Sequence, residues 1–220
     1  DIKLFIKQEP HTPAKIEAKR YRLISVFALV DQMVDRVLFS RVAKAEVDTA
    51  MLRAGKSGWA PMPVGFRDLL TCFGKCALAT DCSAFDWTYP AWIVKLLPSL
   101  ICDSMQESTP AYRAAVRARI DEVLGMHCTL RLPDGTRFQQ SVQGIMKSGW
   151  LLTISKNSDA QELATLLAWS RAYSGPCPRL WAMGDDVIMN WPSELDETPL
   201  VQELARAGLL SKFAIRSSEF

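Results

Sequence analysis

The sequence is short of histidine, of cysteine pairs and of long apolar runs, and each shortage excludes a class of protein. With two histidines in 220 residues, a catalytic histidine pair is not expected, and a zinc site built from Cys72, Cys76 and a histidine is disfavoured. The six cysteines have no C-x-x-C spacing and are expected to be reduced thiols, as in a cytosolic protein. No apolar run approaches the roughly 18 residues that span a bilayer, so no transmembrane segment is expected.

An excess of charge of either sign is also missing. The 26 basic residues nearly balance the 24 acidic ones, and the net charge of +2 does not by itself indicate a polyanionic partner. A nucleic-acid site would therefore have to come from local clusters of charge. Apolar residues make up 49% of the chain, which is enough for the core of one domain, or of one domain with a subdomain.

The apolar pattern changes repeatedly between strand-like and helix-like spacing, without an internal repeat. We expect strands in 1–10, 76–87, 127–142, 179–191 and 211–220, and helices in 90–100, 110–125 and 194–209. Residues 21–47 are expected to begin with a brief extended run and to continue as a helix, and 148–175 to be a loop that leads into a long helix. The segment "AGKSGWAPMPVG" is expected to be a loop, because it is rich in Gly and Pro. Its G-K-S lacks the full spacing of an ATPase phosphate-binding loop, so an ATPase is not expected. This mixed order predicts an α+β fold with helices on one face of a mostly antiparallel sheet.

Two adjacent carboxylates interrupt the apolar segment "RLWAMGDDVIMNW". Asp185 and Asp186 follow Gly184, and a tight turn between two strands would carry them at its tip, although such a turn can also be purely structural. A second strand-like run, "ALATDCSAFDW", ends with Asp81 and has Asp86 five residues later. If the two strands are neighbours, their acids converge at one edge of the sheet. Clustered carboxylates repel each other unless a cation neutralises them, and Mg²⁺ prefers such hard oxygen ligands.

Between these acids lies the polar segment "KSGWLLTISKNS", which begins with a Ser-Gly pair at Ser148 and Gly149. Thr153 and Asn157 are four residues apart and therefore share one face of the helix that follows. Taken alone, the segment is typical of an ordinary polar helix start. In order along the chain, however, D-x4-D, S-G-x3-T-x3-N-S and G-D-D resemble motifs A, B and C of the RNA-dependent RNA polymerases of positive-strand RNA viruses.

The amino-acid sequences of three segments narrow this resemblance to particular virus groups. "IKQEPHTPAKIEAKRYRLISVFALVDQMVDRVLF", "GIMKSGWLLTISKNS" and "SSEF" are similar to the polymerases of sobemoviruses, poleroviruses and barnaviruses. The likeness covers nearly the whole chain, from the fingertip motif to the start of the primer-grip motif. It implies the palm of a right-hand polymerase, an antiparallel sheet packed on helices, together with part of the fingers.

The resemblance also implies how the chain is divided. Residues 1–75 correspond to a fingers segment with motif F and connecting helices, and residues 76–220 to the palm with motifs A to D and the start of motif E. A fingers insertion is expected at about 100–145. The thumb is expected to be absent, since the abrupt ends "DIKLF" and "SSEF" are typical of a segment cut from a longer protein.

In the family, the palm binds two divalent cations, Mg²⁺ with Mn²⁺ able to substitute, between motifs A and C. The resemblance assigns Asp81 and Asp185 as principal ligands, with Asp186 assisting and the backbone carbonyl of Cys82 contributing. Two metals about 4 Å apart would activate the primer 3′-hydroxyl and stabilise the leaving pyrophosphate. Lys212 falls at the place of motif D, where the family has a lysine proposed to protonate pyrophosphate; an ordinary solvated lysine is the alternative.

Nucleotide recognition is assigned by the same resemblance. Asp86 would recognise the ribose 2′-hydroxyl together with Ser148, Thr153 and Asn157, and Gly149 would let the motif B loop move. A site built to hydrogen-bond a hydroxyl rejects the analogue that lacks it, which favours ribonucleotides. The basic residues of motif F would hold the triphosphate, in the order of preference Arg22, Lys7, Lys15, Lys19 and Arg20. A solvated charged face is the alternative for these residues.

The implied function is template-directed RNA synthesis from ribonucleoside triphosphates during replication of a positive-strand RNA virus. The implied partners are template and nascent RNA and a genome-linked protein primer, and the implied location is the host cytoplasm, in a membrane-associated replication complex. Two alternatives stay open. A reverse transcriptase-like polymerase would usually carry a bulky steric gate in place of Asp86, and a non-catalytic RNA-binding palm fragment would bind RNA without synthesis.

Overall fold

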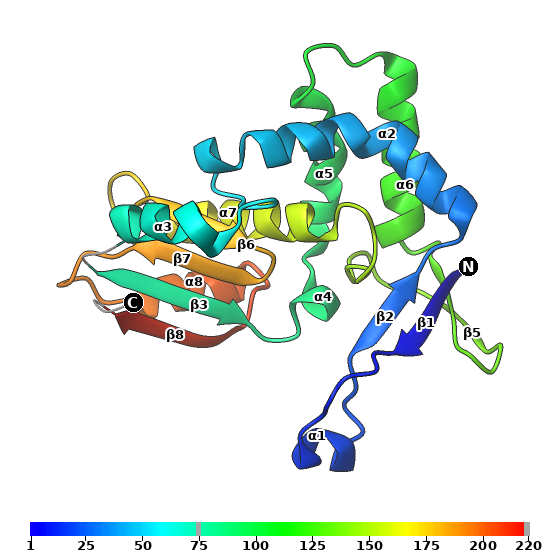
Figure 1. Cartoon of the computed structure of the whole chain (residues 1–220), viewed down its shortest axis with the longest axis horizontal. Coiled ribbons are helices and arrows are strands. Elements are labelled where there is room, and N and C mark those ends of the chain that lie inside the picture. The colour runs from blue at the N-terminus through cyan, green and yellow to red at the C-terminus, as the bar shows by residue number, and fades with distance from the viewer. Residues whose placement is uncertain (74–75, 218–220) are drawn as a thin grey trace.

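Two four-stranded sheets, each packed with helices, make up the described part of the chain, residues 1–73 and 76–217 of a computed structural model (Figure 1). Along the chain the elements are β1 (Ile2–Ile6), α1 (Pro13–Glu17), β2 (Leu23–Val26), α2 (Leu29–Asp48), a 3-10 turn η1 (Ala50–Leu52), a π-helical turn η2 (Pro61–Gly65), α3 (Phe66–Phe73), β3 (Ala77–Cys82), α4 (Phe85–Thr88) and α5 (Ala91–Asp103). They continue with α6 (Pro110–Leu124), β4 (Thr129–Arg131), β5 (Arg137–Gln139), α7 (Thr153–Ala172), β6 (Leu180–Met183), β7 (Asp186–Asn190), α8 (Thr198–Arg206) and β8 (Ser211–Ser217).

The α+β class is confirmed, but the expectation of one sheet is wrong. The first sheet has the order β2-β1-β4-β5 and contains a parallel pair, β1 with β4. The second sheet has the order β6-β7-β3-β8, and all its neighbours are antiparallel. The strand expected over 1–10 already ends at Ile6, because the chain then turns away into the α1 loop (Figure 1).

The second sheet is covered by helices on both faces, which corrects the expectation of helices on one face only. On one face, Leu78, Val187 and Met189 are buried in the main core with small residues of α7. On the opposite face, Trp181 packs edge-on against Phe73 of α3 and against Trp59. Figure 1 accordingly shows α3 in front of the sheet and α7 and α8 behind it.

Local sequence signals explain the helix and turn boundaries outside this sheet. Thr109 caps α6 by accepting a hydrogen bond from the backbone N–H of Tyr112 at 3.2 Å, and Pro110 begins the helix. Gly125 ends it, as predicted. The predicted hairpin is formed by β4 and β5, and its turn is stabilised by Asp134, which accepts from the Thr136 N–H at 2.9 Å.

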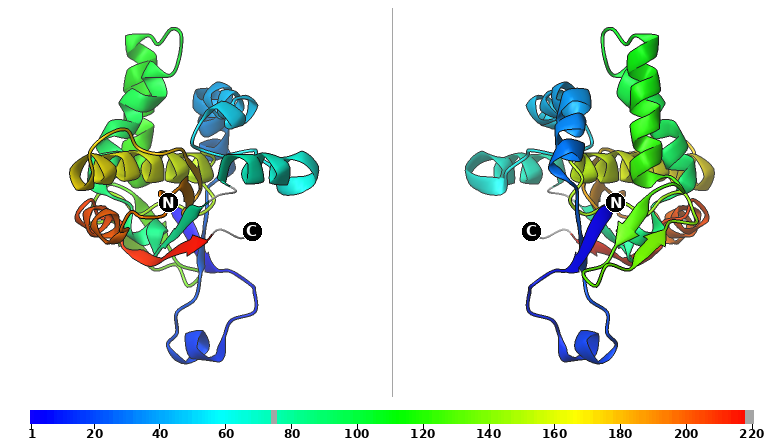
Figure 2. Two further views of the ribbon diagram at one scale, coloured as in Figure 1. Left: turned by 90° about the vertical axis from the view of Figure 1, so that its left-hand side faces the viewer. Right: turned by 90° about the vertical axis from the view of Figure 1, so that its right-hand side faces the viewer.

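Helix α2 crosses the molecule and connects the first sheet to the helices around the second (Figure 1). A buried ion pair anchors its first half, since Nε of Arg119 in α6 donates to Oδ1 of Asp35 at 2.7 Å. Residues 7–22, which include α1, project from the body of the molecule (Figure 2). Among the described residues, no helix is both long and apolar enough to cross a membrane.

Candidate active site

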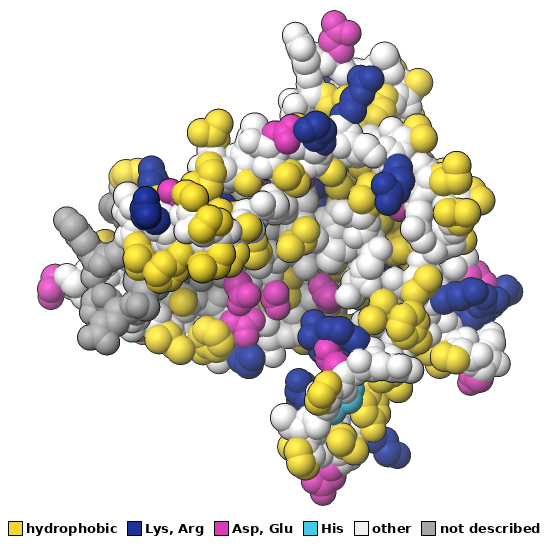
Figure 3. All heavy atoms as spheres, viewed as in Figure 1, with side chains coloured by type: hydrophobic (Ala, Val, Ile, Leu, Met, Phe, Trp, Pro, Cys, Tyr) yellow, Lys and Arg dark blue, Asp and Glu magenta, His cyan; other side chains and the backbone are white. Residues whose placement is uncertain are grey.

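The two strands that carry the predicted acids are hydrogen-bonded neighbours, as the sequence predicted. In the pairing of β3 with β7, Asp81 lies directly opposite Asp186. Gly184, at φ 68°, and Asp185 form the turn that joins β6 to β7, and the positive φ favours a glycine there. The three carboxylates therefore meet at one end of the second sheet. Figure 3 shows acidic side chains gathered near the centre of this face, with basic side chains beside them.

The mutual repulsion of these acids is visible in their electrostatics. Burial, followed by repulsion from Asp185 and Asp81, raises the pKa of the Asp186 carboxyl above its ordinary value. Lys212, at the start of β8, opposes this repulsion, and its Nζ lies 3.0 Å from Oδ2 of Asp81. The lysine predicted at motif D thus contacts the acid predicted at motif A. The ammonium of Lys212 therefore neutralises part of the negative charge that a bound cation would otherwise neutralise.

Helix α7 holds the turn between β6 and β7 in place. The Oγ of Ser158 accepts a hydrogen bond from the Gly184 N–H at 3.0 Å. The side-chain amide of Gln161 donates to the Asp185 carbonyl at 2.9 Å and to Sγ of Cys82 at 3.2 Å. Gln161 was not predicted from the sequence, although it continues the face of Thr153 and Asn157 by one further step of four residues.

A cavity of about 380 Å³ opens beside the acids and is bordered by both sheets and α7. It brings together six of the residues predicted from the sequence, namely Arg22, Asp86, Ser148, Thr153, Asn157 and Asp185. Leu23, Ala84, Phe85, Trp87, Ile154, Met183 and Gly184 complete its lining. Residues from four separate segments of the chain therefore converge on one space.

One wall of this cavity carries an unsatisfied acceptor. The side-chain amide of Asn157 donates to Oδ1 of Asp86 at 3.1 Å. The other end of that amide, Oδ1 of Asn157, is buried and has no hydrogen-bond partner among the described residues. Burial is also the main reason why the pKa of Asp86 is raised, and the hydrogen bond from Asn157 only partly offsets it. Asp86 and Asn157 thus place two polar side chains in the lining of the cavity.

The loop before α7 lies against β2. The Ser25 N–H donates to the Ser148 carbonyl at 2.9 Å, and Oγ1 of Thr153 closes the loop by donating to the Lys147 carbonyl at 2.7 Å. Gly149 has φ 130°, and a Cβ added there would lie 2.2 Å from the Ser25 carbonyl oxygen. Glycine is required at this position by close backbone approach as well as by its φ.

The comparisons with known proteins agree with this geometry. Residues 1–57 and 77–217 match the family described as viral RNA-directed RNA polymerase. The chain belongs to this family.

Curated polymerase relatives come from the three virus groups that the sequence resembles. The chain is 32% identical to Protein P1-P2 of Potato leafroll virus over 213 residues, which cover 89% of the chain and 19% of that protein. It is 35% identical to the replicase polyprotein P2AB of Southern cowpea mosaic virus over 194 residues, 85% of the chain and 19% of the polyprotein. It is 32% identical to the RNA-directed RNA polymerase of Mushroom bacilliform virus over 204 residues, 89% of the chain and 48% of that polymerase. The chain thus spans less than half the length of these relatives.

Of the basic residues predicted to hold a triphosphate, Arg22 is the one that lines the cavity. Its NH1 lies 3.6 Å from Oε1 of Glu9, and Lys7 contacts the same carboxylate at 2.7 Å. Lys15, Lys19 and Arg20 lie in the projecting segment around α1 and are not among the lining residues (Figure 2). The geometry therefore favours Arg22 and leaves the other four as predictions.

The G-K-S segment has a structural role beside the second sheet. Lys56 is buried, its Nζ donates to the Ala50 carbonyl at 2.6 Å, and it lies 4.5 Å above the Trp181 ring. Its backbone N–H donates to the Ala182 carbonyl at 2.8 Å, so the segment extends the sheet beside β6. A phosphate-binding role for this lysine is not compatible with that burial.

The chemistry of Asp81, Asp185 and Asp186 fits a magnesium site, because all three offer carboxylate oxygens. Within the described residues, no group of three His, Cys, Asp or Glu side chains is already closed into a ligand set. The side chain of Cys82 is buried against Gln161, so only its backbone carbonyl would be able to contribute, as predicted. Residues 218–220, where the start of motif E was expected, lie outside the described residues.

Substituting Gly149 tests how tightly the motif B loop is held. Gly149→Ala is expected to destabilise the protein by about 2 kcal/mol, because the added Cβ meets the Ser25 carbonyl and the φ is strained. The thermal unfolding midpoint should fall by about 5 °C. Gly135→Ala is the matched control, since Gly135 also has a positive φ but no atom within 4 Å of an added Cβ. Equal losses in the two variants would contradict the close approach to Ser25.

The repulsion between the acids predicts a stabilising substitution. Because the pKa of Asp186 is raised, its ionisation costs stability above the ordinary value of 3.8. Asp186→Asn should therefore raise the unfolding midpoint of the metal-free protein at pH 7 by ~1–2 °C. The gain should shrink as the pH falls through the raised pKa and vanish below the ordinary value, where the carboxyl becomes neutral in both states. Thermal melts from pH 3.5 to 7.5 measure this, and an Asp186→Asn variant less stable at pH 7 would contradict the repulsion.

Proposed function

We propose that this chain is the catalytic palm, with part of the fingers, of a viral RNA-dependent RNA polymerase. The reaction is transfer of a nucleotide from a ribonucleoside triphosphate to an RNA 3′-hydroxyl, directed by an RNA template. The observation that carries the proposal is the cavity of about 380 Å³ that joins Arg22, Asp86 and Asn157 to Asp185. A basic group, two polar side chains and one of the clustered carboxylates border one space, and these are the kinds of group that bind the phosphates, the sugar and the metal ions of a nucleoside triphosphate.

Asp81, Asp185 and Asp186 are the residues that would hold two divalent cations, Mg²⁺ or Mn²⁺, with help from the carbonyl of Cys82. When bound, such ions supply the Lewis acidity that activates the 3′-hydroxyl and neutralises the departing pyrophosphate. The chain itself contributes position, because the strands and the Gly184 turn fix the acids rigidly at the sheet edge. The repulsion that raises the pKa of Asp186 supports a cation-binding role.

The polar wall of the cavity supports selection of ribonucleotides. A ribose 2′-hydroxyl is able to donate to the buried, unpaired Oδ1 of Asn157 and to accept or donate at Asp86. A deoxyribose would leave those atoms unpaired at a cost of about 1–3 kcal/mol for each buried group. Asp86 also stands where a reverse transcriptase usually has a bulky residue, so the cavity favours the RNA polymerase over that alternative.

The basic residues have two roles in this proposal: those of the N-terminal segment bind the triphosphate, and Lys212 acts on the departing pyrophosphate. Arg22 at the cavity wall is placed to bind phosphate oxygens, with Lys7, Lys15, Lys19 and Arg20 as further candidates for the entry path. Lys212 is the candidate proton donor to pyrophosphate, because its ammonium lies at Asp81 beside the acids. In this proposal it gives up its contact with Asp81 when cations bind.

The division into a fingers segment, residues 1–75, and a palm, residues 76–220, belongs to the same proposal. Template and nascent RNA are the macromolecular partners, and a genome-linked protein primer and a membrane-associated replication complex in the host cytoplasm follow from the resemblance. The named RNA-directed RNA polymerase of Mushroom bacilliform virus, to which the chain is 32% identical, supports this assignment.

Primer extension tests the proposed function. The full-length polymerase that contains this segment is incubated with an RNA template and primer, Mg²⁺ and either rNTPs or dNTPs. Metal-dependent extension with a strong preference for rNTPs is expected. Preference for dNTPs would favour the reverse transcriptase-like alternative, and RNA binding without extension would favour the non-catalytic fragment.

A further inference from the structure

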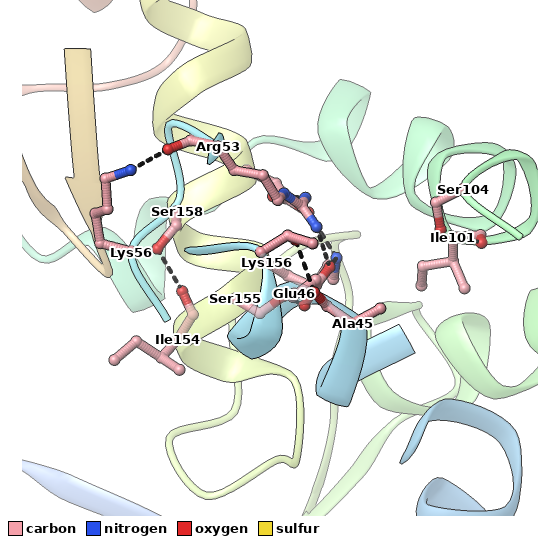
Figure 4. Close-up of polar contacts among 12 residues, drawn as sticks. Ala45, Glu46, Arg53, Lys56, Ile101, Ser104, Ile154, Ser155, Lys156 and Ser158 are labelled. Carbon is pink, nitrogen blue, oxygen red and sulfur yellow. Dashed lines mark hydrogen bonds and ion pairs between the residues drawn. The ribbon is translucent and has the colours of Figure 1, made fainter. Parts of the chain in front are cut away.

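A buried ion pair joins α2 to the motif B helix α7, and neither of its residues lines the nucleotide cavity (Figure 4). The Nζ of Lys156 lies 2.6 Å from Oε1 of Glu46 and 2.6 Å from Oδ2 of Asp159. Ser155 adds a hydroxyl that donates to Oε2 of Glu46. Lys156 is 2% exposed and Glu46 is 5% exposed, so both charges are removed from water.

The charges of this cluster are balanced by a second cation. NH1 of Arg53 lies 3.6 Å from Oε1 of Glu46, and NH2 lies 3.3 Å from Oδ1 of Asp159. Two acids and two bases therefore compensate one another. A balanced buried pair contributes little net stability compared with apolar packing, but loss of one partner leaves an unpaired buried charge. The cluster of charges is consequently well suited to fixing the position of α7 relative to α2.

The residues next to Lys156 are those that shape the active site. The Lys156 carbonyl accepts a hydrogen bond from the hydroxyl of buried Tyr89, just after motif A, at 2.9 Å. The following two residues, Asn157 and Ser158, bind Asp86 and the Gly184 N–H, respectively. Because successive helix residues are rigidly linked at 1.5 Å rise and about 100° of rotation, a shift of Lys156 moves Asn157 with it.

We propose that Glu46 is a positioning residue that, through Lys156, sets the rotation and depth of α7 and thereby places Asn157 for the ribose of the incoming nucleotide. Glu46 does not line the cavity and acts on the substrate only through α7. The inference rests on the proposed function, because it gives a source for the sugar selectivity of that same site. It also makes the fingers helix α2 a determinant of which nucleotide the palm accepts.

A second buried ion pair on the same helix provides a matched control. Asp35 lies in the first half of α2 and contacts Arg119 at 2.7 Å, and it is as buried as Glu46, at 2% exposed. This pair joins α2 to α6 and does not touch α7. Asp35→Asn therefore removes a buried charge from α2 as Glu46→Gln does, without acting on the motif B helix.

The experiment compares Glu46→Gln, Lys156→Met, the double variant and Asp35→Asn in the full-length polymerase. Single-nucleotide addition gives kcat and KM for an rNTP and its dNTP counterpart. Glu46→Gln and Lys156→Met are each expected to lower the rNTP:dNTP ratio of kcat/KM by about tenfold, mainly through poorer rNTP addition. The double variant should lose no more than either single variant, because both act through one contact. Asp35→Asn should keep the ratio within about twofold.

Two outcomes would overturn the inference while leaving the proposed function intact. Either Glu46→Gln keeps the wild-type ratio in an active polymerase, or Asp35→Asn lowers the ratio as much as Glu46→Gln does. If the wild-type polymerase adds no rNTP, the proposed function fails, and hydrogen exchange then tests the positioning role without activity. Amides of 153–161 should exchange at least about tenfold faster in Glu46→Gln than in Asp35→Asn. Equal exchange rates in those two variants would overturn it.

Discussion

Replacing Asp185 with asparagine is expected to slow RNA synthesis by at least about 1000-fold, because one of the carboxylates that hold the cations is lost. Asparagine has nearly the same shape and still accepts hydrogen bonds through its amide oxygen, so the turn at Gly184 should persist. The Asp185 contact to Gln161 is made by the backbone carbonyl and is unaffected by the substitution. The loss should therefore appear in the rate of nucleotide addition, whereas RNA binding stays within about twofold.

Single-turnover extension of a labelled primer measures this rate, at concentrations of Mg²⁺ and rNTP that saturate the wild-type protein. Glu194→Gln serves as the matched control, since it removes an exposed carboxylate from the loop after β7 and should leave the rate unchanged. Raising the Mg²⁺ concentration should restore part of the activity of Asp185→Asn if weaker cation binding is the cause. Extension at a wild-type rate by Asp185→Asn would contradict a catalytic role for the acids where β3 and β7 pair.

The acids of the sheet edge were predictable because strand periodicity and local chain order determine where they lie. A carboxylate at the end of β3 and two after the Gly184 turn reach the same edge once the strands pair, and the apolar residues on either side make that pairing the simplest way to bury them. The cap at Thr109 and the end of α6 at Gly125 are equally local. The helix on the second face of this sheet was not predicted. The segment that contains Trp59 has the composition of a loop, and no helical spacing of apolar residues was recognised between it and β3.

Contacts between distant segments explain the rest of what the sequence did not reveal. The resemblance ranked Arg22 first among the five motif F cations but did not separate it from the others by position. In the structure Arg22 alone among the five reaches the cavity, since the chain projects between β1 and β2. The contact of Gly149 with Ser25 and that of Lys156 with Glu46 depend on how the first sheet and α2 dock against α7. Such docking is not encoded in the spacing of any one motif, so Glu46 carries no local signal of its own.

Asn157→Ala is expected to reduce the preference for rNTPs over dNTPs by about 100-fold. The substitution removes the buried Oδ1 that has no partner among the described residues, and it also removes the amide that donates to Asp86. Addition of rNTPs should become slower or weaker, while addition of dNTPs changes little, because a deoxyribose never used that acceptor. Alanine favours a helix more than asparagine does, so α7 itself should not unfold.

The ratio of kcat/KM for an rNTP and its dNTP counterpart is the appropriate measurement, since it compares the two sugars at the same step. Thr165→Ala is the control, because Thr165 is buried two turns further along α7 and does not line the cavity. A ratio unchanged in Asn157→Ala would mean that the open acceptor is not used by the 2′-hydroxyl. Selection would then rest on Asp86, Ser148 and Thr153, which line the same cavity.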